Sequence, residues 1–233
     1  MASEKVIVAN WKASLLQPAA EKWLRDFSAA YTPLPGIRVV LAMPYPLLVA
    51  LKQQVDRLPG VSAAAQDVSP FPPGRYTGSV PAAMLRGLAD YVLVGHRERR
   101  KYFHETIQDV ANKVAEALDA DILPIVCVDM ETARRQAASL EVEVMERIYV
   151  ACTPDDAEQL ETAPRTSTVT DYVERVAALF PGAPVLYGGG VNAENVGALA
   201  SVPNLAGVMA ASGCLDPVSF VGLLRNAAAV WGG

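Results

Sequence analysis

Histidine and cysteine are scarce in this chain of 233 residues, and their pattern argues against a zinc site or a disulfide framework. The two histidines, His96 and His104, have polar neighbours and no nearby cysteine. The three cysteines, Cys127, Cys152 and Cys214, are an odd set without metal-like spacing. Two fall in apolar runs and the third just after one, which is typical of buried thiols in a reducing cytosol. We therefore expect no bound metal.

Long hydrophobic runs and excess positive charge are also absent. No window approaches the roughly twenty apolar residues that span a bilayer. The start, Met1–Lys5, leads into an apolar run too short for a signal peptide. A net charge of −5 gives no general attraction to nucleic acid or anionic membranes. We expect a soluble, cytoplasmic protein that binds neither, with any positive site confined to a small region.

Hydrophobic residues, by contrast, are plentiful. They make up 52% of the chain and charged residues 19%, which allows a large core and excludes a disordered chain. The length exceeds that of a usual single domain, but parallel barrels reach it as one unit. No linker, low-complexity tract or charge block marks a boundary, so we expect residues 1–233 to form one domain.

Short apolar runs rich in β-branched residues alternate with longer amphipathic segments. Most runs are continuously apolar, as expected of strands covered on both faces. The predicted strands are Val6–Ala9, Arg38–Ala42, Ser62–Gln66, Tyr91–Val94, Leu123–Val128, Arg147–Cys152, Val185–Tyr187 and Gly207–Ala210. The predicted helices are Ala19–Tyr31, Leu47–Val55, Asp109–Leu118, Thr132–Met145, Thr170–Leu179, Glu194–Leu199 and Pro217–Val230. Pro18, Pro46 and Pro217 sit where a helix begins, the position that proline tolerates best.

Eight strand–helix units in a row favour an α/β fold with a closed parallel (β/α)₈ barrel over an open doubly wound sheet. The fourth connection is atypical because Arg97–Thr106 dominates it, and the seventh because it opens with Gly188–Gly190. The turn-forming segment Pro70–Gly74 indicates a stiff protruding loop in the third unit.

Polar side chains follow two of the predicted strands. Asn10-Trp11-Lys12 follows the first strand, and Gly95-His96 ends the fourth. A lysine there is partly desolvated and favours an anion, unless it merely starts an exposed loop. A histidine beside glycine at a strand end is suited to polarising a carbonyl, although a lone histidine is more often structural. Because the carboxyl ends of parallel strands converge, we expect these groups to meet and bind a small anionic carbonyl compound.

Glycine-rich segments follow the last two predicted strands. Gly188–Asn192 follows the seventh and Ala210–Gly213 the eighth. Glycine and small residues let backbone N–H groups approach a phosphate, although each segment alone could be an ordinary tight turn. Together they occupy the usual place of a phosphate site in a parallel barrel.

These motifs give the chain a resemblance to the triosephosphate isomerase family over most of its length. The matching segments agree in order and spacing, and they are Ala9–Lys12, Ala65–Ser69, Tyr76–Val80, Val94–Arg100, Tyr102-Phe103, Glu105-Thr106, Leu186–Gly189 and Val191-Asn192. The resemblance implies a TIM barrel that interconverts a small aldose phosphate and ketose phosphate through an enediolate. It implies no metal or organic cofactor.

The resemblance also implies roles for particular residues. Asn10 and Lys12 would hold the substrate, His96 would polarise its carbonyl oxygen, and Glu98 would support Lys12. The remaining implied residues would offer backbone donors to the phosphate, and they are Gly189, Gly190, Ser212 and Gly213.

One departure concerns the catalytic base. The family has a glutamate followed by proline at the end of strand six, and here Thr153 precedes Pro154. A hydroxyl cannot remove a carbon-bound proton as a carboxylate does. Three interpretations stay open. Glu158 or Glu161, in an altered lid segment, could serve as a displaced base. The chain could carry out changed chemistry on a related phosphorylated carbonyl compound, or bind a phosphoester without turnover.

Two milder departures lie near the site. Gly190 replaces the family's usual serine, which removes a hydroxyl donor but keeps the backbone N–H. Arg97 replaces a serine beside His96, and is either a solvated surface residue or an extra contact for an anion.

The third loop bears on assembly. Gln66–Val80 is not shortened, and Thr77-Gly78 matches the loop tip that docks into a neighbouring subunit in the family. The resemblance therefore predicts a homodimer. The prolines of Pro70–Gly74 would reduce the entropy lost on docking.

Overall fold

Eight parallel strands close into a barrel in the computed structural model, which describes residues 4–154 and 163–232. Each strand pairs with its sequence neighbours, and the first pairs with the last. The strands are β1 (Lys5–Asn10), β2 (Ile37–Met43), β3 (Val61–Ala65), β4 (Tyr91–Val94), β5 (Leu123–Val128), β6 (Tyr149–Cys152), β7 (Val185–Gly188) and β8 (Leu205–Ala210). The predicted α/β fold, a (β/α)₈ TIM barrel, is confirmed.

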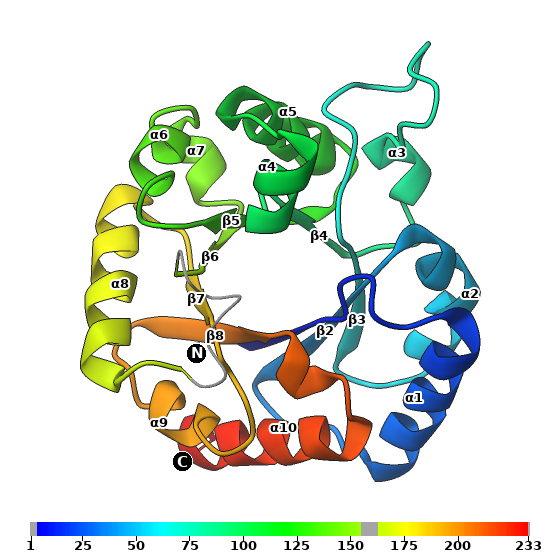
Figure 1. Ribbon diagram of the computed structural model, residues 1–233, viewed down its shortest axis with the longest axis vertical. Helices are drawn as coiled ribbons and strands as arrows, with labels where there is room; N and C mark the ends of the chain where they lie inside the picture. The colour runs from blue at the N-terminus through cyan, green and yellow to red at the C-terminus, as the bar shows by residue number, and fades with distance from the viewer. Residues whose placement is uncertain (1–3, 155–162, 233) are drawn as a thin grey trace.

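Helices form an outer ring around the strands (Figure 1). They are α1 (Gln17–Ala30), α2 (Tyr45–Val55), α3 (Ala82–Leu85), α4 (Arg97–Phe103), α5 (Ile107–Asp119), α6 (Ala133–Ala137), α7 (Val142–Met145), α8 (Thr166–Leu179), α9 (Val196–Ala200) and α10 (Pro217–Trp231), with a 3₁₀ turn, η1 (Ser212–Cys214), before the last. Pro18, Pro46 and Pro217 lie in the first turns of α1, α2 and α10, as predicted.

The prediction of one helix over Thr132–Met145 was wrong. The segment forms α6 and α7, separated by residues 138–141. The Ser139 hydroxyl donates a hydrogen bond to the Gln136 carbonyl at 2.8 Å, so a side chain occupies an acceptor that a continuing helix would use. Glu141 is extended, with ψ of 153°. Local hydrogen bonding therefore outweighs the helical periodicity here.

Other predicted boundaries shift by a few residues. The strand predicted as Ser62–Gln66 is Val61–Ala65, which frees the Gln66 side chain for the mouth of the barrel. The strand predicted as Arg147–Cys152 begins at Tyr149, because the backbone N–H of Arg147 bonds the Val144 carbonyl in a turn. The short helices α3 and α4 were not predicted.

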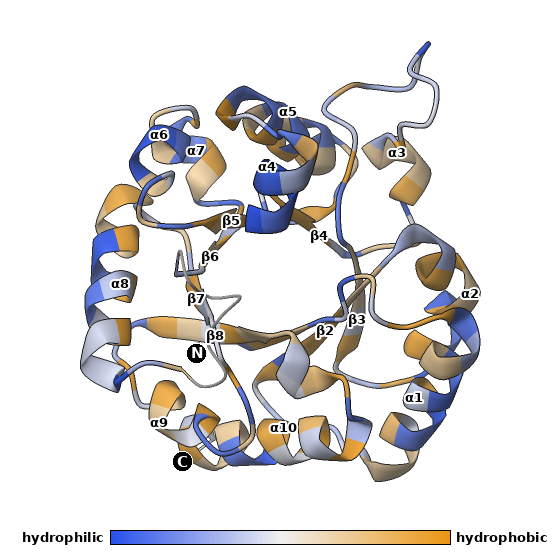
Figure 2. Cartoon of the chain, viewed as in Figure 1, coloured by the Kyte–Doolittle hydropathy of each residue, from blue (hydrophilic) through white to orange (hydrophobic). Residues whose placement is uncertain are grey.

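The core consists of two layers separated by the barrel wall. Alternate strand residues such as Val6, Val8 and Leu93 pack in one cluster, and their neighbours such as Ile7 pack in the other with the helices. The strands are mainly hydrophobic, whereas the helices carry hydrophilic residues as well (Figure 2). This is the pattern expected of a sheet covered on both faces. All three cysteines are buried, as predicted.

Among the described residues, no helix is both long and apolar enough to cross a bilayer. Within the same residues, no group of three or more histidine, cysteine, aspartate or glutamate side chains could hold a metal ion.

Candidate active site

A cavity of about 250 Å³ opens at the carboxyl ends of the strands. Predicted site residues from five separate strand ends line it, and these are Asn10, Lys12, His96, Thr153, Gly189, Gly190 and Ser212. Glu98 lines an adjoining cavity instead, and Gly213 does not line the first cavity, although its neighbour Ser212 does. Glu158 and Glu161 lie outside the described residues. The strand order therefore brings distant motifs together, while their chemical roles stay predictions.

Lys12 is held by its backbone and by its ammonium group. Its φ of 50° is left-handed, and its N–H donates to Asn10 Oδ1 at 3.0 Å. The Nζ atom lies 2.5 Å from Glu98 Oε1, so the predicted contact between these residues is present. Both side chains are about 30% exposed, and such a pair contributes more to orientation than to stability.

Gln66 fixes the same loop and was missed as a site residue. Its Nε2 donates to the carbonyls of Lys12 and Ala42, each at 3.0 Å, and to Asn10 Oδ1 at 3.3 Å. The sequence feature that could have indicated it is an amide side chain directly after the apolar residues Ala63–Ala65. The cross-strand contacts that give Gln66 its function exist only once β1, β2 and β3 are adjacent.

His96 is the N-cap of α4, and its ring orientation follows from that position. Its Nδ1 accepts a hydrogen bond from the backbone N–H of Glu98 at 3.3 Å. A neutral imidazole that accepts at Nδ1 carries its proton on Nε2.

Side-chain hydrogen bonds hold both the N–H and the carbonyl of the residue before His96. Gly95 has φ of 70°, its N–H donates to Glu105 Oε2 at 3.0 Å, and its carbonyl accepts from Arg100 Nε at 2.8 Å. A Cβ at this position would lie 2.7 Å from Arg100 Nη2. Only glycine therefore fits the turn that directs His96 into the cavity.

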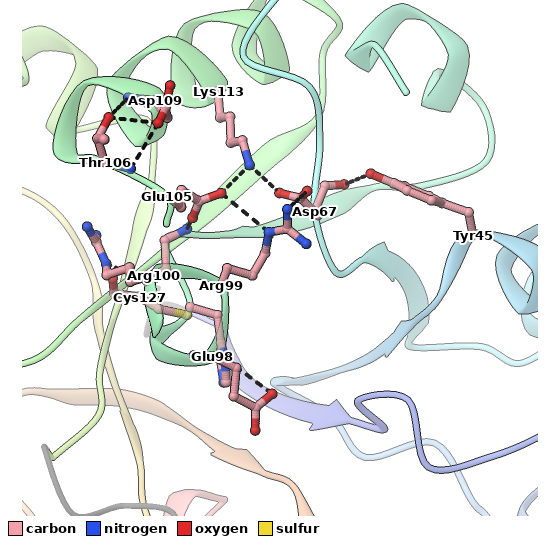
Figure 3. Close-up of polar contacts among 12 residues, drawn as sticks. Tyr45, Asp67, Glu98, Arg99, Arg100, Glu105, Thr106, Asp109, Lys113 and Cys127 are labelled. Atoms are coloured by element: carbon pink, nitrogen blue, oxygen red, sulfur yellow. Dashed lines mark hydrogen bonds and ion pairs between the residues drawn. The ribbon is translucent and has the colours of Figure 1, made fainter. Parts of the chain in front are cut away.

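A buried ion network ties α4 to β3 and α5 (Figure 3). Arg99 lies 2.7 Å from Asp67 and 3.4 Å from Glu105, and Lys113 contacts both carboxylates. Burial raises the pKa of Asp67 above its ordinary value, although the neighbouring cations oppose this. Removing one member of such a network leaves an uncompensated buried charge, so the network holds α4 in place.

The two glycine-rich loops touch each other across the cavity wall. A Cβ on Gly213 would lie 2.4 Å from the Val191 carbonyl oxygen, so the loops after β7 and β8 need glycine to pack this closely. Asn195 Nδ2 donates to the Gly190 carbonyl at 2.7 Å, which holds that loop. The loops after β7 and β8 are thus in direct contact, while their role as a phosphate site stays a prediction.

Thr153 lies at the end of β6 and is buried. Its backbone N–H donates to the Val128 carbonyl at 2.8 Å, and its hydroxyl donates to the same oxygen at 3.3 Å. The hydroxyl is therefore engaged with the main chain. Thr153 lines the cavity, which places a neutral side chain where the resemblance led us to look for a carboxylate.

Arg97 is the first residue of α4 and lines the cavity. Its Nη1 is buried and has no hydrogen-bond partner among the described residues. The sequence left open whether Arg97 is a solvated surface residue or an extra contact for an anion. The buried Nη1 atom does not match a solvated surface residue.

Comparison with known proteins decides the family. A family model described as triosephosphate isomerase matches residues 5–227. The chain belongs to the triosephosphate isomerase family. Similar proteins named triosephosphate isomerase include those of Thermus thermophilus (34% identity, 96% of this chain and 99% of the relative), Stenotrophomonas maltophilia (31%, 97% and 98%) and Dehalococcoides mccartyi (30%, 97% of each).

A second cavity of about 300 Å³ adjoins the first and shares Asn10, Lys12 and His96 with it. Its other walls include Pro44, Gln66 and residues of α4, among them the exposed Phe103. In this member of the triosephosphate isomerase family, Lys12 and His96 thus line both cavities.

Proposed function

We propose that the protein is an aldose–ketose isomerase of the triosephosphate isomerase type. It would act on a small phosphorylated sugar of the glyceraldehyde 3-phosphate or dihydroxyacetone phosphate kind, through an enediolate. The observation that carries the proposal is that Lys12, His96 and the glycine loops line one cavity. The similarity to proteins named triosephosphate isomerase supports the same activity.

The substrate phosphate would lie against the loops after β7 and β8. Backbone N–H groups of Gly189, Gly190, Ser212 and Gly213 are the proposed donors. Backbone donors at such loops favour anions because they carry partial positive charge and no side chain intervenes. Their close packing, with Gly213 against the Val191 carbonyl, supports a preformed site.

The reacting carbons would then lie near Lys12 and His96. The Lys12 ammonium would offset charge that develops on the enediolate oxygens, and its pairing with Glu98 keeps it oriented. The His96 Nε2–H would donate to those oxygens and move a proton between them, because Nδ1 is already occupied. No step in this scheme needs a metal or an organic cofactor.

Proton abstraction from carbon needs a base that Thr153 cannot supply. A displaced base at Glu158 would complete the isomerase. The alternative is a protein with changed chemistry on a related phosphorylated carbonyl compound, or one that binds a phosphoester without turnover. The engagement of the Thr153 hydroxyl with the Val128 carbonyl is the specific observation that favours this alternative.

We also propose that the protein is a homodimer through the loop Gln66–Val80. Residues 71–79 of this loop are exposed, and Phe71 stacks on Tyr76 with ring centroids 4.5 Å apart. The loop projects from the barrel beyond the helices (Figure 1, cyan). The second cavity beside Lys12 and the exposed Phe103 offer an apolar recess for the same loop of another copy.

A coupled assay with both triose phosphates tests the isomerase. We expect turnover in the wild type that Lys12→Ala abolishes, because the enediolate charge is then unbalanced. Glu158→Gln should also abolish turnover if the displaced base is correct. A wild type without turnover, but stabilised against heat by 2-phosphoglycolate, would support the binding alternative, since a ligand of the native state raises stability.

A further inference from the structure

Arg97 has a feature that the proposed isomerase chemistry does not use. Its guanidinium places Nη1 in a buried position with no partner among the described residues. A buried donor left unpaired costs about 1–3 kcal/mol, and more when it is charged. Since Arg97 lines the cavity, a bound ligand is the natural partner for this donor.

The charge balance of the cavity points the same way. The Lys12 ammonium is paired with Glu98, whereas Arg97 has no ion pair among the described residues. No aspartate or glutamate belongs to the described lining. With Thr153 at the end of β6, this part of the lining is cationic rather than anionic. Because Lys12 already has Glu98 as its counter-charge, a ligand whose only anionic group lies on the glycine loops would leave the Arg97 guanidinium without one.

The two anion-binding features stand on opposite sides of the mouth. Arg97 follows β4, and the glycine loops follow β7 and β8, which lie across the ring of eight strands from β4. In Figure 1, α4 and the segment after β8 stand on opposing rims. One phosphate in contact with the glycine loops therefore does not account for the guanidinium.

We propose that the ligand of this cavity carries a carboxylate as well as a phosphate, and that Arg97 binds the carboxylate. The ligand class is a small phosphorylated carboxylic acid, with its phosphate on the glycine loops. The planar guanidinium matches a carboxylate through two parallel hydrogen bonds, which a lysine cannot reproduce. This inference rests on the phosphate site of the proposed function but does not require isomerase turnover.

Calorimetric titration of the full chain with two matched probes tests the proposal. The probes are 2-phosphoglycolate and 2-hydroxyethyl phosphate, which share the phosphate and carbon number and differ in the carboxylate. The wild type should bind 2-phosphoglycolate more tightly. Arg97→Ser should reduce that preference by about tenfold or more, the range of a hydrogen bond to a charged group. Its affinity for 2-hydroxyethyl phosphate should change much less.

Three further variants control the measurement. Arg97→Gln should lose the preference like Arg97→Ser, and it covers the case in which the serine variant does not fold. Arg97→Lys should keep only part of the preference, because the charge remains without the planar fork. Arg57→Ser removes the same charge from an exposed position just after α2 and should leave both affinities unchanged.

The outcomes separate this inference from the proposed function. Equal weakening of both probes by Arg97→Ser would mean that Arg97 binds phosphate, and would overturn the carboxylate assignment while leaving the phosphate site intact. An unchanged preference in both neutral variants would also overturn it. Failure of the wild type to bind either probe would overturn the phosphate site and this inference together. Absence of triose phosphate turnover with the expected preference would overturn only the isomerase.

Discussion

At the scale of single residues, two positions change the charge at the centre of the cavity. Thr153 stands where the family resemblance places a carboxylate, and Arg97 stands where it places a serine. Both residues line the same cavity, although Thr153 follows β6 and Arg97 begins α4, after β4. The substitutions together remove a negative charge and add a positive one. Under the proposed function, these two changes would favour an anion at this position, and proton abstraction would need a group other than residue 153.

Thr153→Glu tests whether the missing base limits the reaction. We expect it to raise isomerase turnover by about 10²-fold or more, the usual contribution of a positioned base. The side chain of residue 153 already lines the cavity, so the carboxylate can be directed toward substrate. Coupled assays in both directions give the measurement.

Thr153→Gln is the matched control, since glutamine has nearly the same size and no basicity. Turnover of a folded Thr153→Glu protein no higher than that of Thr153→Gln would show that this position does not limit the reaction.

At the scale of elements, a capping box begins the helix behind the ion network. Thr106 Oγ1 accepts from the Asp109 N–H at 3.1 Å, and Asp109 Oδ2 accepts from the Thr106 N–H at 2.9 Å. The backbone hydrogen bond from Thr106 lowers the pKa of Asp109, and the hydroxyl hydrogen bond adds to this. Because α5 also carries Lys113, this cap stabilises the helix on which the ion network depends.

The cap gives a pH-dependent prediction. Asp109→Ala should lower the free energy of unfolding by about 0.3–1 kcal/mol at neutral pH, the range for an acidic side chain in the first turn of a helix. The folded pKa of Asp109 lies below its ordinary value of 3.8, so the stabilisation is present above pH 3.8 and lost as the pH falls below it. Urea unfolding at pH 7 and near pH 3 should show the difference between wild type and variant shrinking.

Asp109→Asn controls for the charge. Its amide oxygen can still accept from Thr106, but it does not titrate, so the stability difference between Asp109→Asn and Asp109→Ala should not depend on pH. A constant difference between wild type and Asp109→Ala over the whole range would contradict the assigned role of the carboxylate.

Elements show where sequence patterns succeed and where they fail. The Leu123–Val128 run was predicted within its observed bounds, because a continuous apolar run that is buried on both faces has few alternatives. The helix predicted over Thr132–Met145 failed because Ser139 bonds the main chain locally, a contact that periodicity does not report. The short α4 was missed because its residues are mainly polar and its stability comes from the ion network.

At the scale of the whole molecule, closure of the barrel depends on one close approach. Gly207 in β8 pairs with Val6 in β1, and a Cβ on Gly207 would lie 1.9 Å from the Val6 carbonyl oxygen. Leu186 Cδ2 would lie 2.8 Å from the same Cβ. The backbone of β1 and the side chain from β7 would both have to move.

Gly207→Ala should therefore lower the free energy of unfolding by about 3 kcal/mol or more, the upper range for overpacking. Gly197→Ala is the matched control, because its Cβ would meet nothing within 4 Å in α9. That change should be neutral or stabilise by about 0.5 kcal/mol through the unfolded state. Urea unfolding of both variants gives the comparison, and equal effects would contradict the closure argument.

The proposed dimer predicts the mass of the protein in solution. Sedimentation velocity should give the wild type a mass twice the 24.8 kDa of the chain. Thr77→Arg should give a monomer with lower activity, since it places a charged side chain at the loop tip that the proposal buries. Thr168→Arg, on the exposed face of α8, is the control and should stay dimeric. A monomeric wild type would contradict the proposed dimer.

The order of residues along the chain was enough to predict the (β/α)₈ class and the family resemblance, because apolar runs and motifs such as Ala9–Lys12 can be recognised locally. The tertiary structure decided which groups face one another. It brought Lys12 to Glu98 across 86 positions of sequence, gave Gln66 its three acceptors, and buried one nitrogen of Arg97 without a partner. Periodicity records whether a side chain points inward or outward, whereas contacts between distant residues are fixed only when the strands close into a ring.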